Sequence, residues 1–322
     1  MMTTHDDLPH PVPPFAYLRY KENWFFIILD VANSVYGMAH FNFEPGQDRG
    51  RVSCNLMVRG ELFQYGNQIQ FPRQFAFAPT IGDDKLCVKF IEPHTRIDLQ
   101  LHSDEVDLDM SFVKHAPTFD YGAYDDANPE KPSAQELINF ATHQMYHHQQ
   151  QAMTISGRLQ LKAGKAKGET IALKGIGYRD HSRGMRCDHM TLRHVWTFLY
   201  LPSTVFGAMS LVNVMRPQLT SNSGYVYDGA GMRSLGEMEI TNRGDAGGGM
   251  PASVEFKLHD VYGKPFTLVA DIAKRMGYVP LTVEALNPGG YNYNIVENFA
   301  PVTLKETGEA GHALVEIGFQ GK

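Results

Sequence analysis

Cysteine is scarce in this sequence and does not recur at a metal-binding spacing. The 322 residues contain three cysteines, Cys54, Cys87 and Cys187, which lie far apart. Because no C-x-x-C pair is present, neither a cysteine zinc site nor a disulfide framework is expected. The N-terminal stretch has acidic residues and prolines but no apolar core, so we expect no secretory signal and predict a cytoplasmic protein.

Excess positive charge and long apolar runs are lacking as well. The net charge is −6 and lysine and arginine form no block, which argues against nucleic acid and acidic membrane surfaces as partners. No apolar run approaches the roughly 18 residues that would span a membrane. Neither a P-loop nor a G-x-S-x-G elbow occurs, and nothing indicates nicotinamide chemistry. We therefore expect a soluble, cofactor-independent protein with a small-molecule partner, and the sequence leaves open whether it forms a homodimer.

Alternation of apolar and polar residues dominates what is present. Apolar residues occupy every second position in residues 96–102, and after a turn at Ser103–Asp104 the pattern repeats through residues 106–112. A period of two is the signature of antiparallel strands with one solvated face. Similar runs recur about every dozen residues, which favours an all-β sandwich or barrel over alternating βαβ units.

One segment breaks the β pattern. Residues 133–152 begin with Ser133 and Glu136, an S-x-x-E capping box that predicts a helix of about four turns. Strand patterns resume after this segment. We therefore predict two β-rich domains, residues 1–150, which end in the helix, and residues 151–322.

The densest group of charged side chains lies in residues 175–186, GIGYRDHSRGMR, where a strand pattern ends. Tyr178 and Asp180 share one face of this strand, and His181 points away from them unless the chain bends at His181–Ser182, a bend that Gly184 would permit. Burial would raise the pKa of Asp180 and make it a general acid, whereas the neighbouring arginines would lower that pKa. The alternative is a structural charge network that clamps the end of the strand.

The same segment resembles the motif of the hydroxyneurosporene synthase or carotenoid 1,2-hydratase superfamily, which includes the AttH-like proteins. The motif is a strand ending in G-x-G-x-R-D-H-S, and the matching residues are Gly175, Gly177, Arg179, Asp180, His181, Ser182, Gly184 and Arg186. The resemblance implies two lipocalin-like β-barrel halves in tandem, a site in a cavity between them, and no metal. Relatives usually carry tryptophan at the position of Arg183, so a substrate with a carbonyl, carboxylate or phosphate becomes an option here.

An aromatic stripe follows the motif. His194, Trp196 and Tyr200 fall on one face of a predicted strand, where aromatic rings can hold an apolar ligand and stabilise a carbocation. Such a stripe is also typical of an ordinary core, and Trp24 has the same two interpretations. We keep all four residues as candidates for substrate binding.

The histidines before the motif form the last candidate group. His143 and His147 are spaced i, i+4, so on a helix they would share a face and could bind a metal. No third ligand is nearby in the sequence, and a solvated helix end is the alternative. His147 and His148 remain candidates for substrate binding because they immediately precede the hairpin that bears the motif.

Together these features predict a lyase of the hydratase or dehydratase type, or an isomerase or cyclase, acting on an isoprenoid or other hydrophobic small molecule. Asp180 would donate the proton and His181 would orient or deprotonate water. Arg179 and Arg186 would hold the motif or a polar end of the substrate, and Tyr178 and Arg183 would complete the pocket. The competing hypothesis is a lipocalin-like protein that binds an apolar ligand without chemistry.

Overall fold

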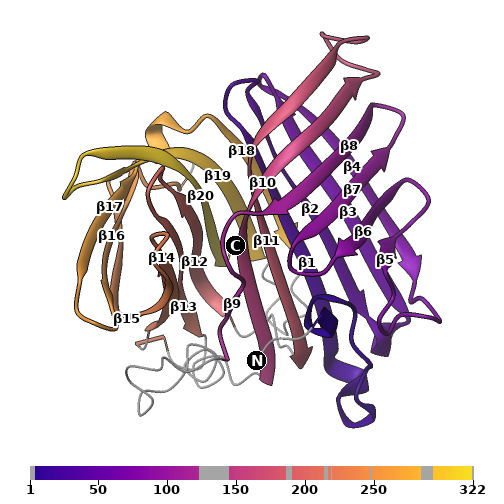
Figure 1. The fold of residues 1–322 in the computed structure, drawn as a ribbon, viewed down its shortest axis with the longest axis horizontal. Helices are drawn as coiled ribbons and strands as arrows, with labels where there is room; N and C mark the ends of the chain where they lie inside the picture. Colours follow the sequence, from indigo (N-terminus) through magenta and orange to yellow (C-terminus); the bar gives the residue numbers. More distant parts are fainter. Residues whose placement is uncertain are drawn as a thin grey trace. The chain divides into compact units, whose positions relative to one another are not determined.

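A computed structural model describes residues 4–122, 145–185, 191–213, 217–218, 220–246, 249–283 and 293–320 (Figure 1). The chain forms two compact units: unit 1 takes residues 1–118 and 146–186, and unit 2 takes residues 119–145 and 187–322. The predicted all-β class is confirmed, because the described residues form strands and short 3-10 helices and no α-helix. No described helix has the length and apolar character that crossing a membrane requires.

The structure differs from the sequence prediction around residue 150. Residues Met145–Leu161 form strand β10, so the second part of the helix predicted over residues 133–152 is wrong. Its first part, with His143, lies outside the described residues. From Met153 onward β10 pairs with β8, and this ladder overrides the local helix signal. The predicted domain boundary at residue 150 consequently falls inside a strand of unit 1.

Unit 1 is built on one antiparallel sheet with the strand order β4-β3-β2-β1-β11-β10-β8-β7-β6-β5 (Figure 1). The hairpin of β10 and β11 is thus inserted between the N-terminal strand β1 and strand β8. The elements of unit 1 are η1 (Thr4–Asp7), η2 (Pro14–Arg19), β1 (Tyr20–Asp30), β2 (Val35–Glu44), η3 (Pro45–Gln47), β3 (Arg49–Val58), β4 (Glu61–Gln70), β5 (Thr80–Gly82), β6 (Leu86–Glu92), β7 (Arg96–His102), β8 (Val106–Lys114), β10 (Met145–Leu161) and β11 (Thr170–Met185).

One face of this sheet carries the core of unit 1. Trp24, Phe26 and Ile28 of β1 are fully buried in it. The alternation predicted for β7 and β8 is confirmed, because the alternating apolar residues from Ile97 to Leu101 and from Val106 to Phe112 are buried in the same core. The motif strand β11 is central in this sheet, and its neighbours are β1 and β10.

Unit 2 is a sheet in the order β17-β16-β15-β14-β13-β12-β20-β19-β18, in which β17 also pairs with β19. This pairing closes eight of the strands into a barrel. The barrel interior holds a second core that includes Leu199, Phe206 and Val226. The elements of unit 2 are β9 (Phe119–Asp120), β12 (Thr191–Tyr200), β13 (Val205–Asn213), β14 (Thr220–Tyr227), β15 (Met232–Arg243), β16 (Ser253–Asp260), β17 (Pro265–Ala270), η5 (Ile272–Lys274), β18 (Gly277–Val283), β19 (Tyr293–Leu304) and β20 (Glu309–Gln320).

The two glycines of the G-x-G motif fit where no other residue fits well. A Cβ atom on Gly175 would lie 2.3 Å from the backbone oxygen of Leu29, and one on Gly177 would lie 2.6 Å from Ile155 Cγ2 and 2.7 Å from the Phe112 ring. Both contacts are shorter than side-chain packing permits, so these glycines let β11 lie close to its neighbours.

Gly177→Ala is therefore expected to lower the free energy of unfolding by about 1–3 kcal/mol, the usual cost of overpacking a core. The measurement is chemical denaturation of the full chain. Gly66→Ala is the matched control, because Gly66 also lies in a strand and a Cβ there would have no neighbour within 4 Å. Equal stability of the two variants would contradict the packing role of Gly177.

Candidate acid–base site

The motif strand presents its charged residues on two opposite faces. Strands β1 and β11 pair in unbroken register from Tyr20 opposite Met185 to Leu29 opposite Ile176. In a regular strand, successive side chains point to opposite faces. The bend at His181–Ser182 that would have joined Asp180 and His181 in one site is absent, so these two catalytic candidates belong to different environments.

Asp180 pairs with His148 of β10. His148 Nε2 and Asp180 Oδ2 form a short hydrogen bond, and the Gln150 amide donates to the same carboxylate oxygen at 2.9 Å. The Tyr178 hydroxyl in turn donates to Gln150 Oε1 at 2.6 Å. Four side chains on neighbouring strands therefore form one connected polar network.

Burial divides this network into a partly open end and a closed end. Asp180 and His148 keep 8% and 6% of their surface exposed, whereas Gln150 and Tyr178 are fully buried. Gln150 and Tyr178 fix the position of the carboxylate, and the Asp180–His148 pair is the more exposed end of the network. Buried polar networks of this kind are rigid when their members are hydrogen-bonded.

The Asp180–His148 pair has the chemical parts of an acid–base site. A carboxylate bonded to an imidazole nitrogen orients the ring and can hold one proton jointly with it. Proton donation and proton uptake by the same pair need no cofactor. Of the predicted residues, the structure thus brings Asp180, Tyr178 and His148 together.

His181 lies on the opposite face, inside the core of unit 1. Its ring stacks on Trp24 with a centroid distance of 4.4 Å, and its Nε2 is 2.9 Å from Glu22 Oε1. Because a carboxylate only accepts, Nε2 carries the proton of the neutral ring. Burial outweighs the attraction of Glu22 and lowers the pKa of His181 to about 4, so the ring is neutral at pH 7.

Glu22 is the centre of this second group. It accepts hydrogen bonds from the backbone and side chain of His10, from the Tyr20 hydroxyl and from His181. Burial alone would raise the pKa of Glu22, but the hydrogen bonds and charges of His10 and His181 lower it.

Two imidazoles and one carboxylate are also a ligand set for divalent metals. The candidate ligand atoms of His10, Glu22 and His181 lie within 4.8 Å of one another. However, four donors already satisfy both oxygens of Glu22, so the group is complete as a hydrogen-bonded anchor for the N-terminal segment.

Arg179 has a structural partner on the same core face as His181. Its Nη1 lies 2.6 Å from Asp7 Oδ1, and both side chains are fully buried. His94 donates its backbone N–H to the other oxygen of Asp7 at 2.7 Å. Burial favours the neutral acid, but Arg179 and His94 hold the pKa of Asp7 below its ordinary value.

The remaining predicted residues of unit 1 are placed as follows. Arg183 is half-buried and lies opposite Glu22 in the β1–β11 ladder. His147 is exposed on β10. Trp24 belongs to the core, as the second of its two interpretations stated. Arg186 lies outside the described residues.

In unit 2 the predicted aromatic stripe lies on β12, on the face opposite to the barrel core. The core side of this strand carries Leu199, whereas His194, Trp196 and Tyr200 alternate with it. His194 Nε2 forms a short ion pair with Glu316, and its Nδ1 lies 2.6 Å from the Tyr293 hydroxyl. Trp196 is nevertheless buried on this face, so both interpretations of the stripe, packed core and ligand-binding wall, stay predictions.

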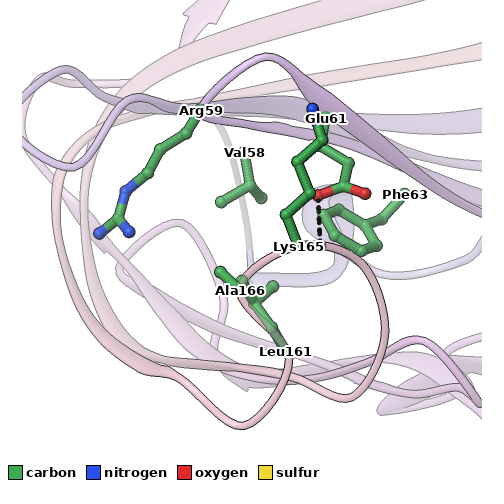
Figure 2. A pocket seen from close by; sticks show the side chains of 7 residues that line it. All are labelled: Val58, Arg59, Glu61, Phe63, Leu161, Lys165 and Ala166. Atoms are coloured by element: carbon green, nitrogen blue, oxygen red, sulfur yellow. Dashed lines mark hydrogen bonds between the residues drawn. The ribbon is translucent and has the colours of Figure 1, made fainter.

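A concave pocket in unit 1 lies away from these groups (Figure 2). It encloses about 210 Å³ at the β3–β4 turn and the tip of the β10–β11 hairpin, below the roughly 300 Å³ of typical ligand sites. Its walls are joined by the Lys165 backbone N–H, which donates to Glu61 Oε2 at 3.0 Å. No hydrogen-bonded acid–base pair such as Asp180–His148 lies among its lining residues, so we do not place the chemistry there.

Sequence reasoning missed several residues of these groups. Glu22 stands beside the apolar run NWFFIILD, and Glu316 stands within ALVEIGF. A charged residue inside an otherwise apolar strand is a signal for a buried partner. Gln150 had no comparable signal, because the run HHQQQ gives no indication of which glutamine is buried.

The comparisons with known proteins agree with this fold. A family model described as a domain of unknown function, DUF7064, matches residues 3–320. No protein of curated function matches the sequence.

Solved structures with a similar fold include an AttH-like protein from Nitrosomonas europaea (12% identity, TM-score 0.60, covering 97% of this chain and 93% of that chain). CghA with Sch210972 is similar as well (9% identity, TM-score 0.61, covering 97% and 93%). So is kievitone hydratase from Nectria haematococca (11% identity, TM-score 0.56, covering 93% and 88%). These neighbours confirm the lipocalin-like fold that the resemblance to the AttH-like superfamily implied.

Proposed function

Because the chain belongs to the DUF7064 family, whose function is unknown, we infer its activity from the site and propose a hydratase or dehydratase that acts on an apolar small molecule. The observation that carries the proposal is the buried Asp180–His148 pair held by Gln150 and Tyr178. The names of the structural neighbours support the class of reaction, because one of them is a hydratase.

The pair supplies both proton transfers that such a reaction needs. In hydration, the Asp180–His148 pair gives its proton to one carbon of an isolated double bond, and a cation forms at the other carbon. Water attacks that carbon, and its extra proton returns to the pair, so the protein ends in its starting state. In dehydration the same steps run in reverse. The substrate class that we propose is an isoprenoid or a similarly hydrophobic alkene or alcohol.

This arrangement revises the roles expected from the sequence. His148, rather than His181, is the imidazole beside Asp180. His181 and Arg179 act as positioning residues, because they anchor the motif strand to Glu22 and Asp7 on the other face.

The test is turnover by Asp180→Asn and His148→Gln. The wild-type chain is incubated with a panel of terpenoid and steroid-like alkenes and alcohols, and products that differ by one water are detected by mass spectrometry. Both variants are expected to lose at least about a hundredfold in rate, the usual contribution of a general acid or base. Their affinity for the same compounds should stay within a few-fold of wild type.

The controls come from an exposed pair of the same composition, His102 and Asp107, whose Nδ1 and Oδ1 atoms lie 3.4 Å apart. His102→Gln and Asp107→Asn should turn over substrate at the wild-type rate. Wild-type turnover by Asp180→Asn would refute the proposed site. A wild-type chain that binds compounds of the panel and converts none would instead indicate a binding protein.

A further inference from the structure

Two glutamates face each other on adjacent strands of the unit 2 barrel. Glu297 of β19 lies directly opposite Glu316 of β20, and Trp196 of β12 lies opposite Glu316 on its other side. Directly opposed residues of antiparallel strands have close side chains, and like charges in such a pair are unfavourable. A sheet therefore keeps such a pair only where a proton or a positive partner compensates it.

Glu297 holds the compensating proton. Its side chain is fully buried, and no donor among the described residues reaches either of its oxygens. Its neighbour across the β19–β20 ladder is the Glu316 carboxylate. Burial, together with the charge of Glu316, raises the pKa of Glu297 well above the ordinary value for a glutamate and so favours the protonated acid.

Glu316 contacts His194 through Oε1 and the ring Nε2, and the Tyr293 hydroxyl lies 2.6 Å from the other ring nitrogen of His194. Gly318 makes this geometry possible, because a Cβ atom there would lie 2.2 Å from His194 Cε1 and 2.7 Å from the Tyr293 hydroxyl. Glu297, Glu316 and His194 thus form a row of two carboxyl groups and one imidazole.

The surroundings of this chain of groups are aromatic. Phe198 and Phe299 lie on the same face of the sheet, one row of side chains away from the Glu297–Glu316 pair, and both are buried. Trp196 is 6% exposed. The side chains of His194 and Glu316 keep 12% and 17% of their surface exposed, so the group is not sealed. A polar pair with one mobile proton within an aromatic surface fits an apolar molecule that carries one oxygen.

We propose that Glu297, Glu316 and His194 form a second ligand site, on the outer face of the unit 2 barrel, that binds the hydroxyl group of an otherwise apolar molecule. A hydroxyl matches the pair because it accepts a hydrogen bond from the acid and donates one to the carboxylate. The inference goes beyond the proposed chemistry at Asp180 and does not depend on it, because it concerns binding to unit 2.

Binding of three probes of one carbon skeleton tests the site. Farnesol, the hydrocarbon farnesene and farnesylamine are titrated into the full chain, with Trp196 fluorescence and calorimetry as readouts. The wild type should bind farnesol at least about tenfold more tightly than farnesene, the difference expected for a hydrogen bond to a charged group. Farnesol should also bind more tightly than the amine, because the proton on Glu297 leaves no excess negative charge for a cation.

Glu297 variants assign the preference to this site. Glu297→Leu should bind farnesol and farnesene within about twofold of each other, whereas Glu297→Gln, which keeps an N–H donor, should retain most of the preference. Glu239→Leu, an exposed position in the same barrel, is the control and should behave as wild type. Glu297→Leu should melt no lower than wild type, because it removes a buried carboxyl that no described donor reaches.

Three results would overturn the proposal. The first is equal binding of farnesol and farnesene by the wild type, or binding of neither. The second is tighter binding of farnesylamine than of farnesol. The third is a preference for farnesol that persists in Glu297→Leu. Asp180→Asn separates this proposal from the proposed function. It should lose turnover and keep the preference for farnesol, so either proposal can fail while the other stands.

Discussion

Arg179→Met is expected to lower the free energy of unfolding of unit 1 by about 3–5 kcal/mol, the cost of leaving one member of a buried ion pair alone. Arg179 and Asp7 are fully buried, and their charged atoms lie 2.6 Å apart. Removing the guanidinium leaves the Asp7 carboxylate with the His94 backbone N–H as its donor among the described residues. Asp7 must then be protonated or exposed to water, and either change loosens the N-terminal segment.

The measurement uses the tryptophans, because the chain has only two and each unit holds one, Trp24 and Trp196. In a Trp196→Phe background, denaturation followed by Trp24 fluorescence reports unit 1 alone. Arg158→Met is the control, since Arg158 forms an exposed ion pair with Asp109. Pairs of that kind contribute at most about 1 kcal/mol.

A double variant separates loss of the ion pair from loss of packing. Asp7→Leu combined with Arg179→Met removes both charges, and apolar replacement of a buried pair is often neutral. The double variant should therefore be more stable than Arg179→Met alone. If the two are equally unstable, the contribution of Arg179 is packing of its aliphatic part and the ion-pair argument is wrong.

The sequence offered two explanations for the charge in β11. The catalytic site stays a proposal, and the structural clamp is supported by the contacts of Arg179 with Asp7 and of His181 with Glu22. Alternation along the strand separates them, because Asp180 points to one face and Arg179 and His181 point to the other. The sequence predicted that separation from the period of a strand alone. It could not tell which face is the core, because β1 is apolar at successive positions from Trp24 to Leu29 and gives no alternation to align with.

The sequence could not identify the partners of these residues, for a related reason. Asp7, His10 and Glu22 lie more than 150 positions before the motif. Glu22 meets it because β1 pairs with β11, and Asp7 and His10 lie in the segment before β1. His148 was a candidate, but its expected helix would have pointed it differently from the strand that places it against Asp180. A local capping signal cannot report a ladder formed with a strand about 40 residues away.

In unit 2 the sequence predicted the stripe but not its charges. His194 and Trp196 were expected on one face and lie there. Glu297 and Glu316 sit in strands that otherwise read as apolar, and their opposition depends on the β19–β20 register. Register is fixed by turns and core packing, so a pair that spans two strands is visible only in the folded sheet.

Acidification should destabilise unit 1 through His181, by up to about 3 kcal/mol between pH 6.5 and pH 4. The pKa of the buried ring is about 4, lower than the ordinary value of 6.5. Between these two pH values the His181 ring is protonated in the unfolded chain and neutral in the folded chain. The free energy of unfolding therefore rises with pH and falls as the solution is acidified. Glu22 acts in the same direction at lower pH, because its folded pKa is lowered from 4.5.

The contributions of His181 and Glu22 can be distinguished by the pH range in which each acts and by a variant of His181. Trp24-monitored denaturation at several values between pH 7.5 and pH 4.5, again in the Trp196→Phe background, gives the dependence. His181→Gln keeps an N–H for Glu22 but cannot titrate, so the slope above pH 4.5 should flatten. His102→Gln removes an exposed histidine and should leave the slope unchanged. An unchanged slope in His181→Gln would mean that this ring is not the buried neutral group that anchors the motif strand to Glu22.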